Sequence, residues 1–346
     1  MEAQDKIKEL FGPYALEAET EIRRLLDEQP DFLMYKMLKY FFGFLDENLK
    51  PIQNYGGKRY RPGLCLMIAE MYGKKSEALE VAASIELYHN FTLIHDDIED
   101  NDPLRRGRPT VWRLWGINHG INSGDALLIL ASKELNEISK KYPEFSVNAV
   151  SFLNEKFKEV IEGQFLDFTL TDLPLGDAFV NEKNYLMMIE KKTSVLVGAS
   201  ARVASIIAQA GEKEQEALWQ YGLNLGLAFQ MQDDLISIWA DSIKTGKIKA
   251  NDIYERKKTL PILRLYECLD EDDKNEFSKI YNQNRRLTDA EVAKIIGWLD
   301  NSDAYNYTKD KIILYSGRAK EAIDELPFAA QAKEKLLEVI GALINF

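Results

Sequence analysis

Aspartates gather at two places in the sequence, and the first group has a spacing that suits a metal ion. Asp96, Asp97 and Asp100 end a long apolar segment. On a helix, Asp96 and Asp100 would project within about 40° of each other, with roughly 6 Å between their Cβ atoms, whereas Asp97 would point about 100° away from Asp96. Mg²⁺ takes one or two such carboxylates and fills its remaining positions with water and phosphate oxygens. The first group therefore predicts a magnesium site for a diphosphate, with Asp97 as a supporting ligand.

Basic residues near this group argue against the alternative, a solvated acidic helix face. The segment Leu104–Pro109 holds three arginines, whose planar guanidinium groups match phosphate geometry. A second basic segment, Gly56–Pro62, carries three cations in four residues beside two glycines that allow an anion to approach the backbone. Either segment alone could be an ordinary surface loop. Together with the aspartates, they predict binding of diphosphate groups.

The second acidic group, Asp233 and Asp234, lies among apolar residues. Burying two carboxylates is unfavourable unless cations compensate them, and a metal ion would do so. Gln230 shares a helix face with Asp233, three residues away. Three lysines are candidates for gripping an outgoing diphosphate, although each alone would be a solvated surface residue; they are Lys192, Lys247 and Lys257.

The elements that position these residues are expected to be helices. Helix-forming residues dominate, and apolar residues recur every three or four positions in four long segments: Glu77–His95, Val147–Phe168, Tyr185–Ala210 and Glu214–Trp239. No long alternating pattern predicts strands, so the expected class is all-α. Breaks are expected at residues 54–57, 101–109, 172–177 and 244–249. None resembles an interdomain linker, and residues 1–346 are expected to form a single domain.

Composition excludes several classes of protein. The 346 residues carry a net charge of −12, which argues against binding to nucleic acid or anionic membranes. The two cysteines, Cys65 and Cys268, match no metal-binding spacing and predict ordinary thiols in a reducing compartment. The N-terminus lacks the pattern of a signal peptide, and the apolar stretch Ser194–Gly211 is too weak for a transmembrane segment. The protein is expected to be cytoplasmic.

In order and spacing, the motifs resemble those of the trans-isoprenyl diphosphate synthases, in particular the geranylgeranyl diphosphate synthases. The likeness covers residues 50–265 and rests on six segments: Gly57–Pro62, His89–Asp100, Arg105–Gly107, Lys192–Thr193, Gly226–Asp234 and Lys257–Pro261. It implies a single isoprenoid synthase domain, with helices around a deep central cavity, the two aspartate motifs on facing helices, and a homodimer. It also implies addition of isopentenyl diphosphate to an allylic diphosphate, namely dimethylallyl, geranyl or farnesyl diphosphate.

The resemblance assigns each candidate residue a role. Metal ligands for about three Mg²⁺ would be Asp96, Asp97, Asp100, Asp233 and Asp234. The allylic diphosphate would be held by Arg105, Lys192, Lys247 and Lys257, with Gln164 and Asp167 nearby. Isopentenyl diphosphate would be bound by Lys58, Arg61, His89 and Arg106. Catalytic roles, stabilising a cationic transition state or relaying a proton, would belong to Lys192, Thr193 and Gln230.

Two further positions bear on the activity. The family's second motif commonly ends in a third aspartate, and this chain has Ser237 there, which puts the affinity for a third metal ion in doubt. Phe91 and Thr92 precede the first aspartate where the family sets product length, and a single aromatic residue resembles the producers of twenty-carbon chains. Ordinary core packing is the alternative role for Phe91.

Two rival functions remain. A terpene cyclase of related fold would ionise one allylic diphosphate without needing isopentenyl diphosphate, and the four residues of the isopentenyl diphosphate site argue against it. A catalytically silent partner subunit of an active prenyltransferase is supported by Ser237 alone.

Overall fold

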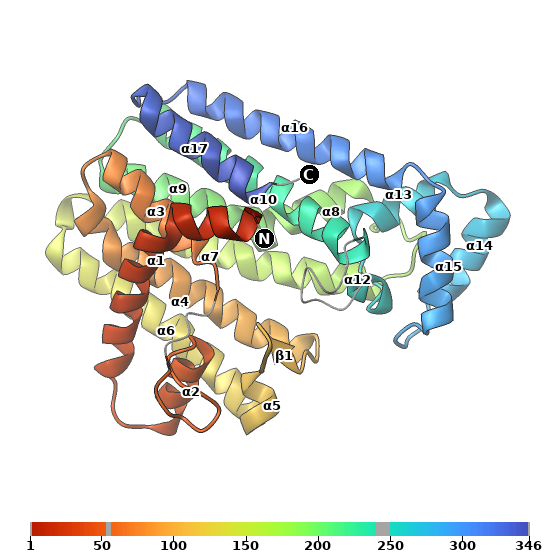
Figure 1. The fold of residues 1–346 in the computed structure, drawn as a ribbon, viewed down its shortest axis with the longest axis horizontal. Helices are drawn as coiled ribbons and strands as arrows, with labels where there is room; N and C mark the ends of the chain where they lie inside the picture. The colour runs from red at the N-terminus through yellow and green to blue at the C-terminus, as the bar shows by residue number, and fades with distance from the viewer. Residues whose placement is uncertain (1, 53–56, 240–249, 345–346) are drawn as a thin grey trace. The chain divides into compact units, whose positions relative to one another are not determined.

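The computed structural model describes residues 2–52, 57–239 and 250–344, and these are helical almost throughout (Figure 1). The expected all-α class is confirmed. From the N-terminus to the middle of the chain, the elements are α1 Glu2–Asp27, α2 Leu33–Phe41, α3 Tyr60–Met71, α4 Lys75–Glu99, β1 Leu104–Arg105, β2 Arg108–Pro109, α5 Val111–Trp115, α6 Ile117–Lys141 and α7 Pro143–Asp172. The remaining elements are α8 Glu182–Ile189, the π-helix η1 Glu190–Ser194, α9 Val195–Ile207, α10 Glu212–Trp239, α12 Asn251–Tyr254, α13 Leu260–Cys268, α14 Glu271–Tyr281, α15 Asp289–Asp300, α16 Ala304–Asp324 and α17 Ala330–Leu343.

The chain forms two compact units. The first consists of Met1–Asn154 and Ser200–Gln215, and the second of Glu155–Ala199 and Glu216–Phe346. Helices α7, α9 and α10 therefore contribute to both units. Each unit is described by itself below, and the single domain expected from the sequence remains a prediction.

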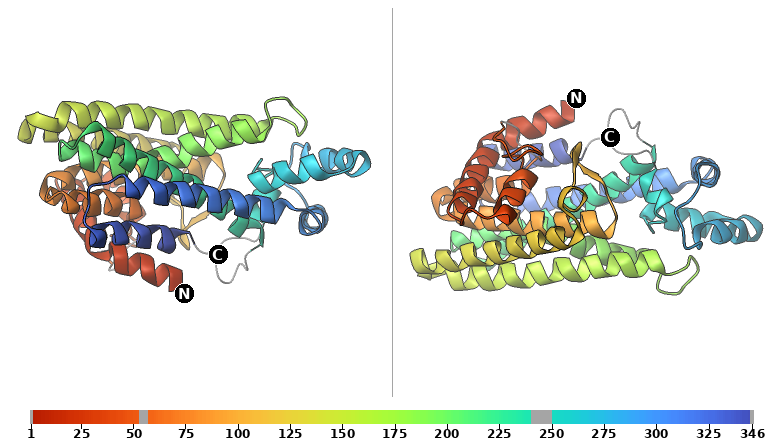
Figure 2. Two further views of the ribbon diagram at one scale, coloured as in Figure 1. Left: turned by 90° about the horizontal axis from the view of Figure 1, so that it is seen from above. Right: turned by 90° about the horizontal axis from the view of Figure 1, so that it is seen from below.

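In the first unit, α4 packs along α6, and the two run side by side in Figures 1 and 2. Two glycines of α6 permit this close approach. A Cβ atom on Gly120 would come to 2.7 Å from the Ile98 side chain, and one on Gly124 would overlap the His95 ring. Both contacts fall on the last turns of α4, so the small residues of α6 fix the end of α4 that carries Asp96 and Asp100.

A short hairpin follows α4. Strands β1 and β2 pair antiparallel, with Arg105 opposite Arg108. The two residues between them, Arg106 and Gly107, have φ angles of 54° and 76°, as a tight two-residue hairpin loop requires. The break expected at residues 101–109 is therefore confirmed, but it contains a hairpin that helical periodicity could not predict.

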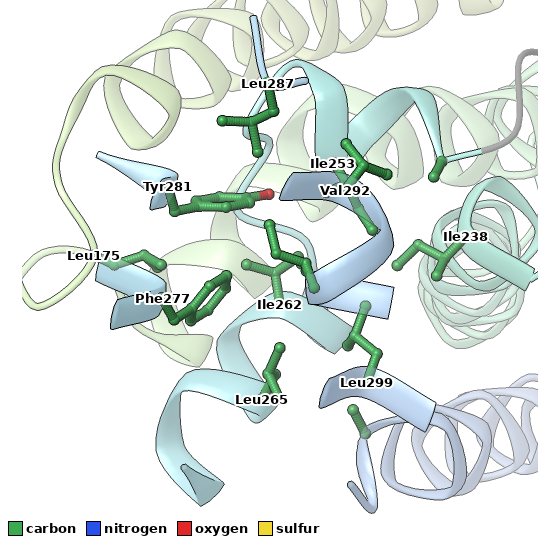
Figure 3. Packing of buried hydrophobic residues seen from close by; sticks show 13 residues of the cluster. Leu175, Ile238, Ile253, Ile262, Leu265, Phe277, Tyr281, Leu287, Val292 and Leu299 are labelled. Atoms are coloured by element: carbon green, nitrogen blue, oxygen red, sulfur yellow. The ribbon is translucent and has the colours of Figure 1, made fainter. Parts of the chain in front are cut away.

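In the second unit, a cluster of buried apolar residues connects α10 to the helices from α12 to α15 (Figure 3). Ile253 and Ile262 lie at its centre with the rings of Phe277 and Tyr281. The Tyr281 hydroxyl donates a hydrogen bond to the backbone oxygen of Lys257 at 2.7 Å. This cluster thus anchors the segment between α12 and α13, which carries one of the predicted diphosphate-binding lysines.

The rest of the second unit surrounds α10. Helices α16 and α17 lie side by side (Figure 1, and Figure 2, left), and a second apolar cluster joins α7, α8, α10, α13 and α16. The stretch Tyr185–Ala210, predicted as one helical segment, is interrupted by η1. In the described part of the chain, no helix has both the length and the hydropathy that crossing a membrane requires.

Candidate active site

The first acidic group lies at the C-terminal end of α4 in the first unit. Asp97 is buried, and its Oδ1 accepts a hydrogen bond from Arg105 Nε at 2.6 Å. Asp96 and Asp100 are only partly buried, and Asp100 is the C-cap residue of the helix. Arg105 Nη2 lies 4.0 Å from Asp96 Oδ2. Asp97 thus holds Arg105 in a position beside Asp96.

The environment of Asp97 is unfavourable for a lone carboxylate. Burial raises the pKa of the Asp97 carboxyl to about 6, although the charge of Arg105 lowers it. Its Oδ2 is buried and has no hydrogen-bond partner among the described residues. Such an atom has lost its hydration without replacement, so a cation or an ordered water would stabilise it.

A basic cluster adjoins this helix in the same unit. Arg61 Nη1 donates a hydrogen bond to His89 Nε2 at 3.0 Å. Burial and the charges of Arg61, Arg106 and Arg105 hold the pKa of the His89 imidazole well below its usual value, so the ring is neutral and its proton is on Nδ1. Gly57, with φ +100°, lies where a Cβ would come to 3.0 Å from the Arg106 guanidinium carbon. The structure thus draws Arg61, His89 and Arg106 together around the turn that also carries the exposed Lys58.

The two positions predicted to set product length have different surroundings. Phe91 is buried and makes edge-to-face contacts with the rings of Tyr88 and His95, at centroid distances of 5.3 and 5.0 Å. Thr92 is partly buried, and its hydroxyl donates to the His89 backbone oxygen at 2.8 Å. Both the core-packing role and the chain-length role of Phe91 are compatible with this geometry.

The second acidic group lies near the end of α10 in the second unit, where four side chains form a hydrogen-bonded chain. The Thr193 hydroxyl donates to Gln230 Oε1 at 2.8 Å, and Gln230 Nε2 donates to Asp234 Oδ1 at 3.1 Å. The Tyr185 hydroxyl donates to the other oxygen, Asp234 Oδ2, at 2.6 Å. Asp233 is partly buried. Asp234 therefore fixes Gln230 and, through it, Thr193.

Asp252 lies close to this group. Burial raises the pKa of the Asp234 carboxyl to about 8, and the negative charge of Asp252 contributes. The Ser237 hydroxyl lies 2.5 Å from Asp252 Oδ2 and can donate to it, and the Ser237 backbone oxygen accepts from Ala250 N at 2.7 Å. Ser237, which stands where the family has an aspartate, thus binds an aspartate fifteen residues later.

The predicted diphosphate-binding lysines of the second unit meet at one carboxylate. Lys192 Nζ lies 2.6 Å and Lys257 Nζ 3.3 Å from Asp167 Oδ2. Burial would raise the pKa of the Asp167 carboxyl, but the two lysine charges outweigh it and lower that pKa to about 2. Gln164 is partly buried one turn earlier on α7. Lys247 lies outside the described residues.

The π-helix η1 presents Lys192 and Thr193, and glycines let the neighbouring helices approach it. A Cβ atom on Gly163 of α7 would overlap the backbone of Lys192. One on Gly226 of α10 would come to 2.5 Å from Ser194 Cα. The extra residue of a π-helix turn redirects the side chains that follow it, and here two backbone-to-backbone contacts hold that turn in place.

The donor set fits a hard cation, although the side chains are not gathered as a closed cage. Within the described ranges, no three His, Cys, Asp or Glu side chains are close enough to hold a metal ion by themselves. Mg²⁺ requires only one or two carboxylates when phosphate oxygens and water complete its shell. The unsatisfied Oδ2 of Asp97 is an atom that a nearby cation would stabilise.

Sequence reasoning missed two partners of the acidic groups. Tyr185 comes from a helix 49 residues before Asp234, and no local pattern links them. Asp252 could have been suspected, because it precedes the predicted Lys257 by only five positions. Ser237 gave no indication that its hydroxyl binds a carboxylate.

Comparisons with known proteins agree with these observations. The family model of the polyprenyl synthetases matches residues 43–299. A geranylgeranyl pyrophosphate synthase of Geoglobus acetivorans is 36% identical over 343 residues, covering 98% of this chain and 99% of the relative. A (2E,6E)-farnesyl diphosphate synthase of Mycobacterium bovis is 39% identical over 247 residues, covering 70% of this chain and 66% of the relative.

Solved structures agree as well. The crystal structure of a geranylgeranyl pyrophosphate synthetase from Pyrococcus horikoshii superimposes with a TM-score of 0.85 at 30% sequence identity, covering 100% of both chains. The resemblance inferred from the motifs is therefore confirmed over nearly the whole chain.

Proposed function

This chain belongs to the polyprenyl synthetase family, and we propose that it is a magnesium-dependent trans-prenyltransferase that adds isopentenyl diphosphate to an allylic diphosphate. The observation that carries the proposal is that the chain has residues for two diphosphates. One proposed set comprises Arg105, which lies beside Asp96 in the first unit, and Lys192 and Lys257, which share Asp167 in the second unit. The other set lacks metal-binding carboxylates and consists of a basic turn with Arg61 bound to His89.

The allylic diphosphate is assigned to the set that contains the carboxylates. The direct ligands of Mg²⁺ would be the partly buried aspartates of the two groups, Asp96, Asp100 and Asp233. The buried Asp97 and Asp234 would support them. About three ions are expected for a diphosphate that leaves. Bound magnesium would neutralise the leaving diphosphate and so favour ionisation of the carbon–oxygen bond.

When substrate binds, the two lysines would exchange their ion pair with a protein carboxylate for one with the allylic diphosphate. Asp167 binds Lys192 and Lys257 and orients both. This supports a role for Asp167 as the counter-ion of the diphosphate-binding lysines rather than as a direct ligand, because a carboxylate repels an anionic diphosphate. Lys247 and Gln164 remain predicted members of this set.

Isopentenyl diphosphate is assigned to Lys58, Arg61, His89 and Arg106. Neutral His89 accepts from Arg61 through Nε2 and keeps a proton on Nδ1 to donate. Arginine can bind a phosphate through two parallel hydrogen bonds. These groups would hold the second substrate without promoting loss of its diphosphate.

After ionisation, the allylic cation has to be stabilised by polar side chains held in fixed positions. The Thr193 hydroxyl and the Gln230 amide lie in the chain that ends at Asp234. We assign them to stabilising positive charge on the ionised allylic carbon, which the isopentenyl double bond attacks. Proton loss completes the addition, and the departed diphosphate is the assigned acceptor. Exclusion of water is essential because water would react with the cation.

The product is proposed to be geranylgeranyl diphosphate. The relatives include both geranylgeranyl and farnesyl diphosphate synthases. The twenty-carbon length therefore rests on Phe91, which is aromatic at the fifth position before Asp96 whereas Thr92 at the fourth is not. A homodimer and a cytoplasmic location are part of the same proposal.

The test is product analysis. Purified protein is incubated with Mg²⁺, labelled isopentenyl diphosphate and allylic primers of five, ten and fifteen carbons, and the dephosphorylated products are separated by chromatography. A linear twenty-carbon alcohol is expected. A shorter or longer alcohol would retain the reaction and discard the role of Phe91. A cyclic hydrocarbon without label would indicate a cyclase, and absence of any product a silent subunit.

A further inference from the structure

Arg59 is the middle cation of the basic turn, between Lys58 and Arg61, and it is the most deeply buried of the three. Its side chain is only 1% exposed, whereas Lys58 is exposed. Three cations in four residues predicted a cradle for an anion. One of them, Arg59, instead points into the protein interior. Its contribution must therefore be something other than direct contact with an anion.

A cage of acceptors surrounds the Arg59 guanidinium within the first unit. Nε donates to Glu19 Oε1 of α1 at 2.9 Å, and Nη1 donates to Glu86 Oε1 of α4 at 2.6 Å. Nη2 donates to the backbone oxygen of Phe42 at 3.3 Å. Both carboxylates are buried, and Glu86 Oε1 also accepts from Asn90 at 2.7 Å. Two helices and one loop therefore converge on a single side chain.

The backbone of Arg59 gives this cage a function. Arg59 is the N-cap of α3 and has a left-handed conformation, with φ 45° and ψ 32°. A non-glycine residue adopts it only when its surroundings impose it. This conformation separates the two neighbouring cations, because Lys58 precedes the reversal and Arg61 lies in the first turn of α3 against His89.

We propose that Arg59 is a positioning residue for isopentenyl diphosphate: held by Glu19 and Glu86, it fixes the turn that presents Lys58 and Arg61 without itself contacting the substrate. The inference rests on the proposed function, because it assigns this turn to the second substrate. It predicts that neutralising the cage weakens binding of isopentenyl diphosphate and leaves the allylic substrate unaffected.

The experiment compares Michaelis constants in single variants. Glu19→Gln keeps the shape and an acceptor oxygen but removes the charge that holds Arg59, and Glu86→Gln does the same on α4. The matched control is Glu17→Gln, two residues earlier on α1, whose carboxylate lies 3.0 Å from Lys75 Nζ. Arg59→Lys, which keeps the charge but cannot reach three acceptors at once, is the fourth variant.

Glu19→Gln and Glu86→Gln are each expected to raise the KM for isopentenyl diphosphate by about 10-fold, as for the loss of a charge-assisted hydrogen bond. The KM for the allylic diphosphate and kcat at saturation are expected to change less than about 2-fold. Glu17→Gln should change none of the three. Thermal unfolding of each variant shows whether it is folded. If another variant does not fold, Glu19→Gln alone is sufficient to test the inference.

Two results would overturn the inference: an unchanged KM for isopentenyl diphosphate in Glu19→Gln and Glu86→Gln, or an equal rise in both KM values. Either can be recognised only in a wild-type protein that turns over. Failure of the wild-type protein to incorporate isopentenyl diphosphate would instead overturn the proposed function, and the inference with it.

Discussion

At the scale of single residues, the two acidic motifs share one arrangement of their side chains. Each has two adjacent aspartates, and in each the second one is buried and hydrogen-bonded: Asp97 to Arg105, and Asp234 to Tyr185 and Gln230. Adjacent residues on a helix point about 100° apart, so only one of the pair can remain at the partly exposed face. The first aspartate of each pair is partly buried and is the one proposed to bind a metal ion, and the second orients its surroundings.

Asp96→Ala is expected to lower turnover at saturating substrate by at least about 100-fold, because it removes a proposed direct ligand of Mg²⁺. Ser237→Ala is expected to lower turnover by less than about 10-fold and the free energy of unfolding by about 1–2 kcal/mol, because it removes a hydroxyl that contacts Asp252 and the Asp234 backbone oxygen but is no proposed metal ligand. Steady-state rates and chemical unfolding of both variants test this. Equal losses of turnover would contradict the assignment.

The residue scale was the most predictable from sequence. Helical spacing alone predicted that Asp97 would diverge from Asp96, and the family resemblance assigned Arg61 and His89, which are in contact, to one substrate site. It could not predict that Arg59 would be buried, because three adjacent cations look alike until the partners on α1 and α4 are known. The partners lie 40 and 27 residues away, and no local rule connects them.

At the scale of elements, the site depends on a local departure from the α-helix. The periodicity of Tyr185–Ala210 predicted helix and could not reveal η1, since one extra residue in a turn leaves the apolar pattern almost unchanged. Nor could it reveal the hairpin after α4. Glycines in the sequence were the available signal, and their meaning became clear only from the backbone that each one contacts.

Gly163→Ala is expected to destabilise the second unit by about 1–3 kcal/mol, because the added Cβ would overlap the Lys192 backbone in η1. Turnover should fall as well, since Lys192 and Thr193 would be displaced. The matched control is Gly297→Ala in α15, where nothing lies within 4 Å; it is expected to gain about 0.5–1 kcal/mol from helix propensity. Thermal unfolding and rates measure both, and equal behaviour of the two variants would argue against the proposed contact.

A buried carboxylate between α6 and α1 predicts a pH dependence of stability. Burial raises the pKa of the Glu134 carboxyl to about 7, with Glu21 adding and Arg24 opposing. The folded protein therefore binds more protons than the unfolded chain between pH 4.5 and pH 7, and this contribution to stability is lost as pH rises through that window. Glu134→Gln should be stabilised relative to wild type above pH 7 and not below pH 4.5. Urea unfolding across this range measures the difference, and a constant difference would exclude Glu134 as its source.

At the scale of the whole molecule, the residues proposed to bind diphosphate occur in both compact units. The sequence predicted the class and the family because the motifs recur in a fixed order, and the matched family model covers residues 43–299. The charged helices from α14 to α17 carry no motif, and the sequence predicted for them only a scaffolding role. The apolar cluster to which α14 and α15 contribute supports the Lys257 segment, a role that depends on tertiary contacts.

The prenyltransferase assignment is tested most directly by incorporation of labelled isopentenyl diphosphate into an acid-labile allylic product, measured with geranyl diphosphate as primer in excess Mg²⁺ and again after chelation with EDTA. Incorporation is expected to occur with Mg²⁺, to be lost with EDTA, and to recover when Mg²⁺ is restored. Incorporation that persists without the metal would contradict the role of the two acidic motifs, and absence of incorporation under all three conditions would contradict the prenyltransferase assignment itself.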